Sequence, residues 1–549
     1  MSTDPVQRIR WKEPEWAVSV VLLTAVTLAC LLPFLGKAVH MDDPLFLWTA
    51  RHIQSDPLDF YGFRVSWEAR PMPMSAVTQN PPLSAYYLAA VGRLLGWSEP
   101  ALHCGGLFPA LAAVLGTFFL ARRFCAHPFA AALLTLATPV FLLSGTSLMC
   151  DTPMLALWVW SVLLWIDGLE GKSPIKLWLA ALLIAACCLT KYFGVCLLPL
   201  LLLYSAMRER RAGWWLFYLL FPVAVLACYQ WLTFKLYGRG LLLNAASYAV
   251  HGRVAAGLAS KTLTALAFTG GCLFFSLPAL PAAWGRKGLA AGLALTVAMI
   301  GLVVGLKTLG VFSMIEAGHV KWPFVVQFAA LAVGGAAVLA LAVADALEHR
   351  TPASVLLLLW TAGTFLFASA VNWTVSGRNF LPLAPAASLL LIRRLESRPG
   401  AIDYLWWPLL LSLGAGLMAA RADWAAANAA RAAALSVQQA LAGRASEIDY
   451  EGHWGFQYYM DQLGAKPLDR ASPRLVPNEM IVVPVNNSFI FALPADRVQP
   501  WADYRVLPPP WMTLMSVPAG AGYYSDGWGP APFVFGAAPP DEYVVFRVK

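Results

Sequence analysis

The stretch that decides the fold is AVSVVLLTAVTLACLLPFLG, residues 17–36. A run of about 20 apolar residues is long enough to cross a bilayer as a helix. The polar Lys37 follows it without a small-residue cleavage site, so we expect an uncleaved signal anchor. The same apolar character extends over the chain, because 59% of its 549 residues are hydrophobic and 13% are charged. Soluble domains carry about 25% charged residues, so a soluble enzyme, a disordered chain and a nucleic-acid-binding module are excluded.

Working outward from this stretch, hydropathy predicts about thirteen membrane spans and an all-α polytopic membrane protein. The runs are 17–36, 101–121, 128–146, 152–168, 176–190, 193–207, 214–235, 262–282, 289–306, 322–344, 353–371, 380–395 and 404–420. Segment 81–96 is too short and contains Arg93, so we expect a helix lying at the outer interface within the first outer loop, 37–100.

The net charge of +9 belongs to the first 420 residues, because acidic residues outnumber basic ones beyond them. With the N-terminus inside, every short basic cluster falls on the inner side, as the positive-inside rule requires. These clusters are Arg8-Ile9-Arg10-Trp11-Lys12, Arg122-Arg123, Lys172 with Lys176, Arg208-Glu209-Arg210-Arg211, Arg286-Lys287, His349-Arg350 and Arg393-Arg394. The first outer loop and the region beyond residue 420 then lie outside.

The chain changes character at residue 421, which divides a membrane domain, 1–420, from an outer soluble domain, 421–549. An Ala-rich helix opens this second part. The runs MIVVPV, SFIFAL and EYVVFRV then predict strands of a small α/β domain. The aromatic segment GHWGFQYYMDQLG, 452–464, is interpreted as its core, with recognition of an acceptor sugar or peptide as the alternative.

Charged residues of separate segments share the outer face in this topology. They are Asp42 and Asp43 after the first span, Asp151, Lys191 and Arg378. A carboxylate here can act as a general base on a hydroxyl, and the cations can bind an anionic group. Each also has a structural alternative, as a helix cap for the carboxylates and as an interfacial anchor for the cations.

Glu316 and His319 also fall outside and are a candidate metal pair, although two residues do not make a site. A divalent metal is therefore a candidate cofactor, and its ligands are unknown. The chain contains no P-loop, G-x-G-x-x-G loop, nucleophile elbow or HExxH motif.

Six motifs, in order, resemble the GT-C glycosyltransferases of the bacterial branch related to protein O-mannosyltransferases and the lipid A aminoarabinose transferase (glycosyltransferase family 39). The likeness covers roughly residues 15–400. The motifs are Asp42-Asp43 with Ala50-Arg51, Asn80-Pro81-Pro82-Leu83-Ser84-Ala85-Tyr86-Tyr87, Gly96-Trp97-Ser98-Glu99 with Leu102-His103, Asp151-Thr152-Pro153-Met154, Leu189-Thr190-Lys191 and Arg378-Asn379-Phe380-Leu381-Pro382-Leu383.

The resemblance implies an inverting transfer of a sugar from a polyprenyl-phosphate donor to a hydroxyl acceptor on the outer side of a bacterial inner membrane. It implies that Asp42 is the catalytic base, with Asp43 and Asp151 as further acids of the site. Lys191 and Arg378 would bind the donor phosphate. Arg51, Asn80, Tyr192, Glu316 and His319 are further candidates for the donor or acceptor site. Two residues depart from the family pattern. Asn80 stands where the family often has His or Lys, and His103 stands where it usually has Arg.

Glycolipid, envelope glycan and protein all fit as acceptor. The competing hypothesis is a membrane transporter of a lipid-linked or anionic substrate, although the charges gather at one face and no repeat is evident. A structural protein whose outer domain binds a partner is a third hypothesis.

Overall fold

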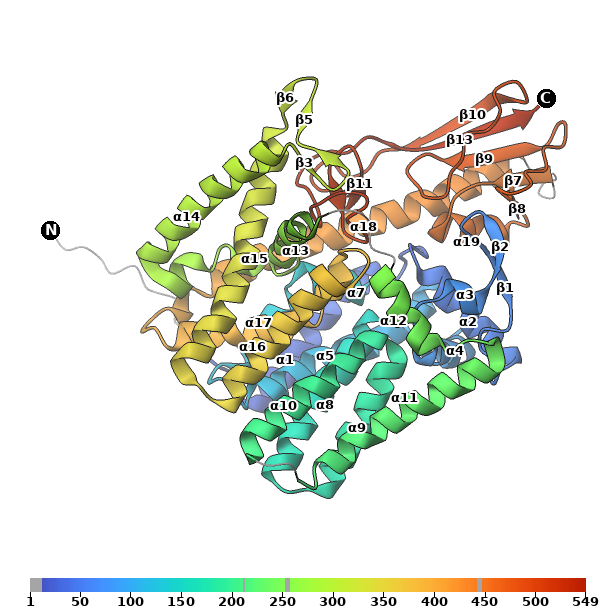
Figure 1. Cartoon of the computed structure of the whole chain (residues 1–549). Coiled ribbons are helices and arrows are strands. Elements are labelled where there is room, and N and C mark those ends of the chain that lie inside the picture. The colour runs from blue at the N-terminus through green and yellow to red at the C-terminus, as the bar shows by residue number, and fades with distance from the viewer. Residues whose placement is uncertain (1–11, 211–212, 252–256, 442–446) are drawn as a thin grey trace.

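The computed structural model describes residues 12–210, 213–251, 257–441 and 447–549. Helices make up 64% of the chain and pack into one bundle, and a strand-containing region covers one end of it (Figure 1). This architecture confirms the predicted class, a helical multi-pass membrane protein with a small C-terminal region that contains strands.

Nine helices among the described residues are long and apolar enough to cross a membrane. They are α1 continued by η1 (Trp16–Leu31, Leu32–Phe34), α5 (Glu99–Ala121), α8 (Asp151–Glu170), η2 continued by α10 (Tyr192–Cys196, Leu197–Glu209), α11 (Leu216–Tyr237), α14 (Leu280–Leu306), α15 (Trp322–His349), α16 continued by η4 (Pro352–Leu366, Phe367–Val371), and η6 continued by α18 (Ile402–Tyr404, Trp406–Ala440).

The other four predicted spans are shorter or bent helices, so the count of thirteen stays a prediction. They are α6 with α7 (Pro128–Leu136, Pro139–Gly145), α9 (Pro174–Thr190), α13 followed by η3 (Leu258–Cys272, Phe274–Ser276), and α17 (Leu383–Glu396). The 64° bend between α6 and α7 has a local cause. Pro139 opens α7, and the Thr138 hydroxyl accepts a hydrogen bond from the Phe141 N–H, so a new helix starts there.

The predicted inner basic clusters meet at one end of the bundle. Arg123 pairs with Glu170, which also pairs with Arg208. Arg393 pairs with Asp345 at 2.7 Å and donates to the carbonyl of the residue after Arg123. These ion pairs join the loops to one another at this end of the bundle. Residues 8–11 and Arg211 of these clusters lie outside the described residues.

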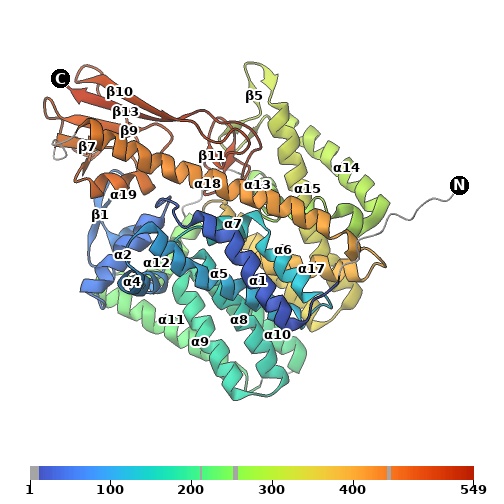
Figure 2. The same ribbon diagram turned by 180° about the vertical axis from the view of Figure 1, so that it is seen from behind.

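The first outer loop folds into short elements that pack at the other end of the bundle (Figure 2). They are α2 (Asp43–Ser55), β1 (Arg64–Trp67), β2 (Arg70–Pro73), α3 (Met74–Val77) and α4 (Leu83–Leu95). Helix α4 is the predicted helix of segment 81–96, and its interfacial position stays a prediction. Further along the chain are α12 (Leu241–His251), the hairpins β3–β4 (Thr308–Leu309, Phe312–Ser313) and β5–β6 (Ile315–Glu316, His319–Val320), and the turn η5 (Gly377–Phe380).

The C-terminal strands form one five-stranded sheet in the order β10-β13-β9-β7-β8. They are β7 (Ile448–Tyr450), β8 (Lys466–Pro467), β9 (Met480–Pro484), β10 (Val498–Val506) and β13 (Asp541–Val548), and α19 (Trp454–Gln462) lies between β7 and β8 in sequence. Strands β9 and β13 are the predicted runs MIVVPV and EYVVFRV. Most of α19 is buried, which agrees with its interpretation as core.

The predicted strand SFIFAL, 488–493, is wrong. Within the described residues, this segment is an irregular connection between β9 and β10. Phe489 has φ of 56°, which ends extended backbone. Phe491 donates its N–H to the Glu451 carboxylate at 3.0 Å instead of to a strand.

The region beyond residue 420 is also joined to the bundle more closely than two separate units would be. Helix α18 runs without a break from the last predicted span into the Ala-rich segment. The segment 511–536, with β11 (Met515–Ser516) and β12 (Ala521–Gly522), then leaves the sheet and packs on the membrane helices. Gly377 donates its N–H to the Tyr523 carbonyl at 2.7 Å, and Phe535 donates to the Gln327 amide oxygen at 2.7 Å.

Candidate active site

A cavity of about 530 Å³ lies where the first outer loop, the starts of α8 and η2, the turn η5 and the segment 511–536 converge. Its wall is lined by Met41, Asp42, Leu45, Trp67, Val77, Gln79, Asn80, Cys150, Asp151, Lys191, Tyr192, Phe193, Val195, Leu242, Ala245, Ala246, Tyr248, Ala249, Phe367, Val371, Asn372, Trp373, Thr374, Ser376, Arg378, Asn379, Trp454, Met515, Tyr524, Ser525 and Trp528. Four of the predicted charged residues therefore share one cavity, although they come from four separate segments.

Asp42 lies directly before the first residue of α2 and pairs with Arg378. The distance from the Asp42 Oδ2 to the Arg378 Nη2 is 2.9 Å. Asp42 is at the N-cap position of this helix, but its side chain makes no capping hydrogen bond. The alternative reading of Asp42 as a plain helix cap therefore does not describe its side chain, which points its carboxylate at a cation in the cavity.

Asp151 and Lys191 form the second ion pair of the cavity. The Lys191 Nζ lies 2.6 Å from the Asp151 Oδ1 and also donates to the Asn379 amide oxygen at 3.3 Å. Asp151 opens α8, where the positive end of the helix dipole favours a carboxylate. Lys191 sits in the extended break between α9 and η2, so its side chain can leave the helix bundle. The pair holds a cation beside the Arg378 turn.

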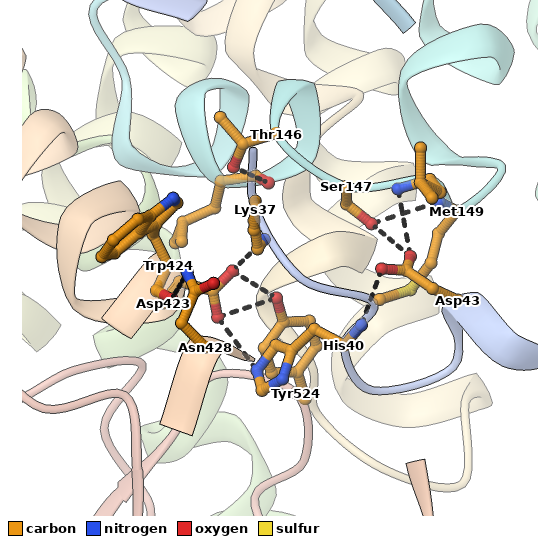
Figure 3. A network of polar contacts seen from close by, with 12 residues as sticks. Lys37, His40, Asp43, Thr146, Ser147, Met149, Asp423, Trp424, Asn428 and Tyr524 are labelled. Carbon is orange, nitrogen blue, oxygen red and sulfur yellow. Dashed lines mark hydrogen bonds and ion pairs between the residues drawn. The ribbon is translucent and has the colours of Figure 1, made fainter. Parts of the chain in front are cut away.

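Asp43 differs from its neighbour. It is fully buried and does not line the cavity. Its carboxylate accepts hydrogen bonds from the His40 N–H, the Leu148 N–H and the Ser147 hydroxyl, at 3.0, 3.0 and 3.1 Å (Figure 3). Burial raises the pKa of Asp43, and Lys37 and the two backbone N–H groups oppose that rise. The structure therefore gives Asp43 the contacts of a residue that fixes the loop before Asp42.

Two uncharged candidates line the cavity. Asn80 is held by its carbonyl, which accepts a hydrogen bond from the Tyr61 hydroxyl at 2.7 Å. Tyr192 follows Lys191 directly, and its hydroxyl lies 2.9 Å from that of Tyr229. Both side chains line the cavity that also contains Lys191 and Arg378.

The remaining candidates lie elsewhere. Arg51 is exposed and stacks on Trp97, with 4.4 Å from its guanidinium carbon to the ring centroid. Glu316 and His319 are exposed on the β5–β6 hairpin, where Glu316 pairs with Lys321. Within the described ranges, no three His, Cys, Asp or Glu residues are grouped so that they could hold a metal. The structure does not bring Glu316 and His319 to the cavity.

Sequence reasoning missed Tyr524 and Trp528 in the aromatic wall of the cavity, whereas Trp454 lies in segment 452–464, for which acceptor recognition was the alternative interpretation. Trp454 and Trp528 come from the C-terminal region, and their rings are 5.7 Å apart. Tyr524 lies with its ring 5.6 Å from the Arg378 guanidinium carbon. The signal that could have found two of them is GYYSDGWGP, 522–530, an aromatic and Gly-rich loop in a region otherwise interpreted by its strands.

A buried polar network supports the segment that leads to Asp42. Asp423 of α18 accepts hydrogen bonds from the Lys37 ammonium at 2.5 Å and the Tyr524 hydroxyl at 3.0 Å, and it lies 3.4 Å from the His40 ring (Figure 3). Lys37 is fully buried. One carboxylate thus ties together the end of the first span, the last span and the C-terminal segment.

Part of the chain is similar to a known family. Residues 79–234 match the family model of dolichyl-phosphate-mannose-protein mannosyltransferases. The predicted resemblance to GT-C glycosyltransferases is confirmed. The matched segment includes Asn80, Asp151 and Lys191 of the cavity. No curated protein matches the chain.

Several solved structures are similar to this chain. ArnT from Cupriavidus metallidurans, bound to undecaprenyl phosphate, is 14% identical, with 86% of this chain and 94% of that chain covered and a TM-score of 0.46. Arabinofuranosyltransferase AftD from Mycobacteria is 12% identical, with 98% of this chain and 40% of that chain covered and a TM-score of 0.39. Arabinosyltransferase EmbB from Mycobacterium smegmatis is 14% identical, with 91% of this chain and 46% of that chain covered and a TM-score of 0.35.

Proposed function

We propose that this chain is an inverting membrane glycosyltransferase that moves a sugar from a polyprenyl-phosphate donor to an acceptor hydroxyl. One observation carries the proposal. The carboxylate of Asp42 and the cations Lys191 and Arg378 line one cavity at the end of the bundle opposite the basic clusters. Such a cavity offers a base for the acceptor and positive charge for the departing phosphate. The description of the family model that matches residues 79–234 names dolichyl-phosphate-mannose, a sugar linked to a lipid phosphate, and this supports the same type of reaction.

The reaction is a single displacement. Asp42 takes the proton of the acceptor hydroxyl as the hydroxyl oxygen attacks the anomeric carbon. The bond from that carbon to the phosphate oxygen breaks, and the polyprenyl phosphate leaves with the bonding electrons. Because attack and departure occur on opposite faces of the sugar, the anomeric configuration inverts.

Arg378 and Lys191 stabilise the negative charge that develops on the phosphate. Arg378 has five N–H donors, and Asp42 accepts from one of its nitrogens, so the guanidinium can contact a phosphate and Asp42 together. Lys191 adds a compact charge, held in place by Asp151. In this proposal Asp151 is a positioning residue.

One wall of the cavity suits a lipid chain. Helix α12 contributes Leu242, Ala245, Ala246 and Ala249, whose spacing puts them on one helix face. Phe193, Phe367 and Val371 continue the apolar lining. We propose that the polyprenyl chain leaves the cavity along this wall, with the reaction on the periplasmic side of a bacterial inner membrane.

The test uses the purified chain in proteoliposomes with a polyprenyl-phosphate sugar that carries a radiolabel. An envelope extract serves as acceptor. We expect label to move onto an acceptor and polyprenyl phosphate to be released in equal amount, with the opposite anomeric configuration in the product. Retention of configuration would exclude the single displacement. Movement of unreacted donor across the bilayer, with no transfer, would favour the transporter hypothesis instead.

A further inference from the structure

A second cavity, of about 420 Å³, lies between α18 and the C-terminal sheet. Its polar lining comes from His40, Asp423, Asn486, Asn487, Thr513, Ser516, Asp541 and Glu542. The second cavity borders the first one, because Met41, Trp454, Met515 and Trp528 line both. Met41 precedes Asp42 directly in the chain, so the second cavity ends beside the proposed base.

The two cavities differ in charge. The first contains Lys191 and Arg378, whereas none of the described residues that line the second is Lys or Arg. The acidic groups there are Asp423, Asp541 and Glu542, and the His40 imidazole also lines this cavity. Asp423 is paired with Lys37, and Glu542 is paired with Arg505 on β10. A phosphate or carboxylate ligand would therefore meet repulsion in the second cavity and attraction in the first.

The remaining groups suit a ligand that is rich in hydroxyls. Carboxylate and amide oxygens accept hydrogen bonds from hydroxyls, and the Asn486 and Asn487 side chains also contain donors. Asp541 accepts a hydrogen bond from the Asn486 amide at 2.9 Å and has further acceptor capacity. The His40 Nε2 makes no hydrogen bond among the described residues, although it lies 3.4 Å from Asp423.

Two tryptophans stand at the junction of the cavities. The rings of Trp454 and Trp528 are 5.7 Å apart at 51°, and both are partly exposed. An indole face is apolar and its N–H is polar, so each ring can contact the C–H face of a sugar while leaving the hydroxyls to polar partners. The junction therefore offers stacking surfaces on the path to Asp42.

We propose that the second cavity binds the acceptor, and that the acceptor is an uncharged or amine-bearing glycan recognised by its hydroxyls. This inference rests on the proposed function, since it supplies the hydroxyl that the reaction needs. The glycan lies along Asn486, Asp541 and the tryptophan pair, and its terminal hydroxyl reaches Asp42. That hydroxyl oxygen bonds to the anomeric carbon as the bond to phosphate breaks, and Asp42 receives the proton.

The experiment uses the full chain in nanodiscs, a radiolabelled polyprenyl-phosphate sugar, and an envelope glycan extract divided by anion exchange. The unbound fraction contains uncharged and amine-bearing glycans, and the bound fraction contains phosphorylated and acidic ones. Two variants probe the second cavity, Asp541→Asn for its carboxylate and Asn486→Trp to fill it. Asp503→Asn and Asp503→Trp are matched controls, because Asp503 lies on the neighbouring strand β10 and does not line the cavity.

We expect label to move onto the unbound fraction. Asp541→Asn should raise the acceptor concentration for half-maximal transfer about tenfold, the loss of one hydrogen bond of about 1.4 kcal/mol. Asn486→Trp should abolish transfer. Both variants should still hydrolyse the donor slowly with water, at the wild-type rate and with the wild-type donor concentration for half-maximal hydrolysis. Both Asp503 variants should behave as wild type.

Three results would overturn the inference. They are transfer onto the bound fraction alone, wild-type acceptor dependence in both cavity variants, and a fall in donor hydrolysis that matches the fall in transfer. Failure of the proposed function is distinguishable, because the wild-type chain would then neither transfer nor hydrolyse any donor.

Discussion

At the residue scale, two adjacent carboxylates have different surroundings because a helix begins between them. Asp42 precedes α2 and reaches into the cavity, whereas Asp43 is the first helical residue and turns toward Ser147 and Leu148. Met41 has φ of 45°, an unfavourable backbone for a side chain of its size, so the surrounding contacts must hold this turn. Asp43 supplies three of them.

We expect Asp43→Asn to weaken the fold more than the chemistry. An amide cannot accept at both positions, so one buried N–H loses its partner, which costs about 1–3 kcal/mol. Thermal unfolding of the detergent-solubilised variant should show the loss, and its transfer rate per folded molecule should stay within about tenfold of wild type. Normal unfolding with complete loss of transfer would instead assign Asp43 to the reaction.

Asp423 and Lys37 permit a second test at this scale. Asp423→Asn leaves the fully buried Lys37 ammonium without its carboxylate. Breaking a buried ion pair by removing one partner costs about 3–5 kcal/mol, because the other charge stays desolvated. The double variant Asp423→Asn with Lys37→Met should recover most of this loss in thermal unfolding. A double variant as unstable as the single one would show that the pair is not the source of the effect.

At the element scale, the helices were the predictable part. Each of the thirteen apolar runs contains a helix, because hydropathy over 15 to 20 residues reports burial in lipid or protein. The same runs did not distinguish full spans from bent or short helices such as α6 with α7 and α17. That distinction depends on packing against neighbours and on local caps such as Thr138. Strand β10 was missed because most of its residues are exposed and it contains Pro500, so it forms no apolar run.

The C-terminal sheet contains a carboxyl group that makes its stability depend on pH. Glu451 is buried, with one oxygen bonded to the Phe491 N–H and the other without a hydrogen bond in the described structure. Burial raises the pKa of Glu451 from 4.5 to about 7. Between pH 4.5 and pH 7 the folded chain therefore binds a proton at Glu451 that the unfolded chain does not. The resulting contribution to the free energy of unfolding is present below pH 4.5 and is lost as the pH rises through 7.

Glu451→Gln should remove this dependence. Well below pH 4.5 the variant and the wild type should unfold at the same temperature, since both side chains are neutral in the folded and the unfolded chain. At pH 8 the variant should be more stable by about 3 kcal/mol, from 1.36 kcal/mol for each of about 2.5 pKa units. Thermal unfolding across this pH range measures the difference. A constant offset at every pH would mean that Glu451 does not change its charge there.

At the scale of the whole molecule, the cavity is assembled from both ends of the chain. The sequence placed Asp42, Asp151, Lys191 and Arg378 on one face through topology alone, and the structure brings them into one cavity. It did not predict Tyr524 or Trp528, because an irregular segment that returns to the membrane helices leaves no periodic signal. The contact depends on single residues, such as Gly377 beside Tyr523.

Gly377 is where the returning segment touches the Arg378 turn. A Cβ at this position would lie 2.3 Å from the Tyr523 ring, closer than atoms can approach. We expect Gly377→Ala to displace Tyr523 and Tyr524, which should lower transfer about tenfold or more and expose segment 511–536 to limited proteolysis. Gly414→Ala on α18 is the control, because its Cβ would meet nothing within 4 Å. Wild-type transfer and protection in Gly377→Ala would contradict this role for the segment.

Asp42 is the base of the proposed reaction, and one measurement tests this role most directly. The rate of sugar transfer from a polyprenyl-phosphate donor is compared between wild type and Asp42→Asn in nanodiscs. Asparagine keeps an acceptor for Arg378 but cannot take a proton. We expect a rate of transfer lower by about 10²–10⁴-fold in Asp42→Asn, with donor binding and thermal unfolding unchanged. Transfer at the wild-type rate by Asp42→Asn would contradict the role of Asp42 as the base.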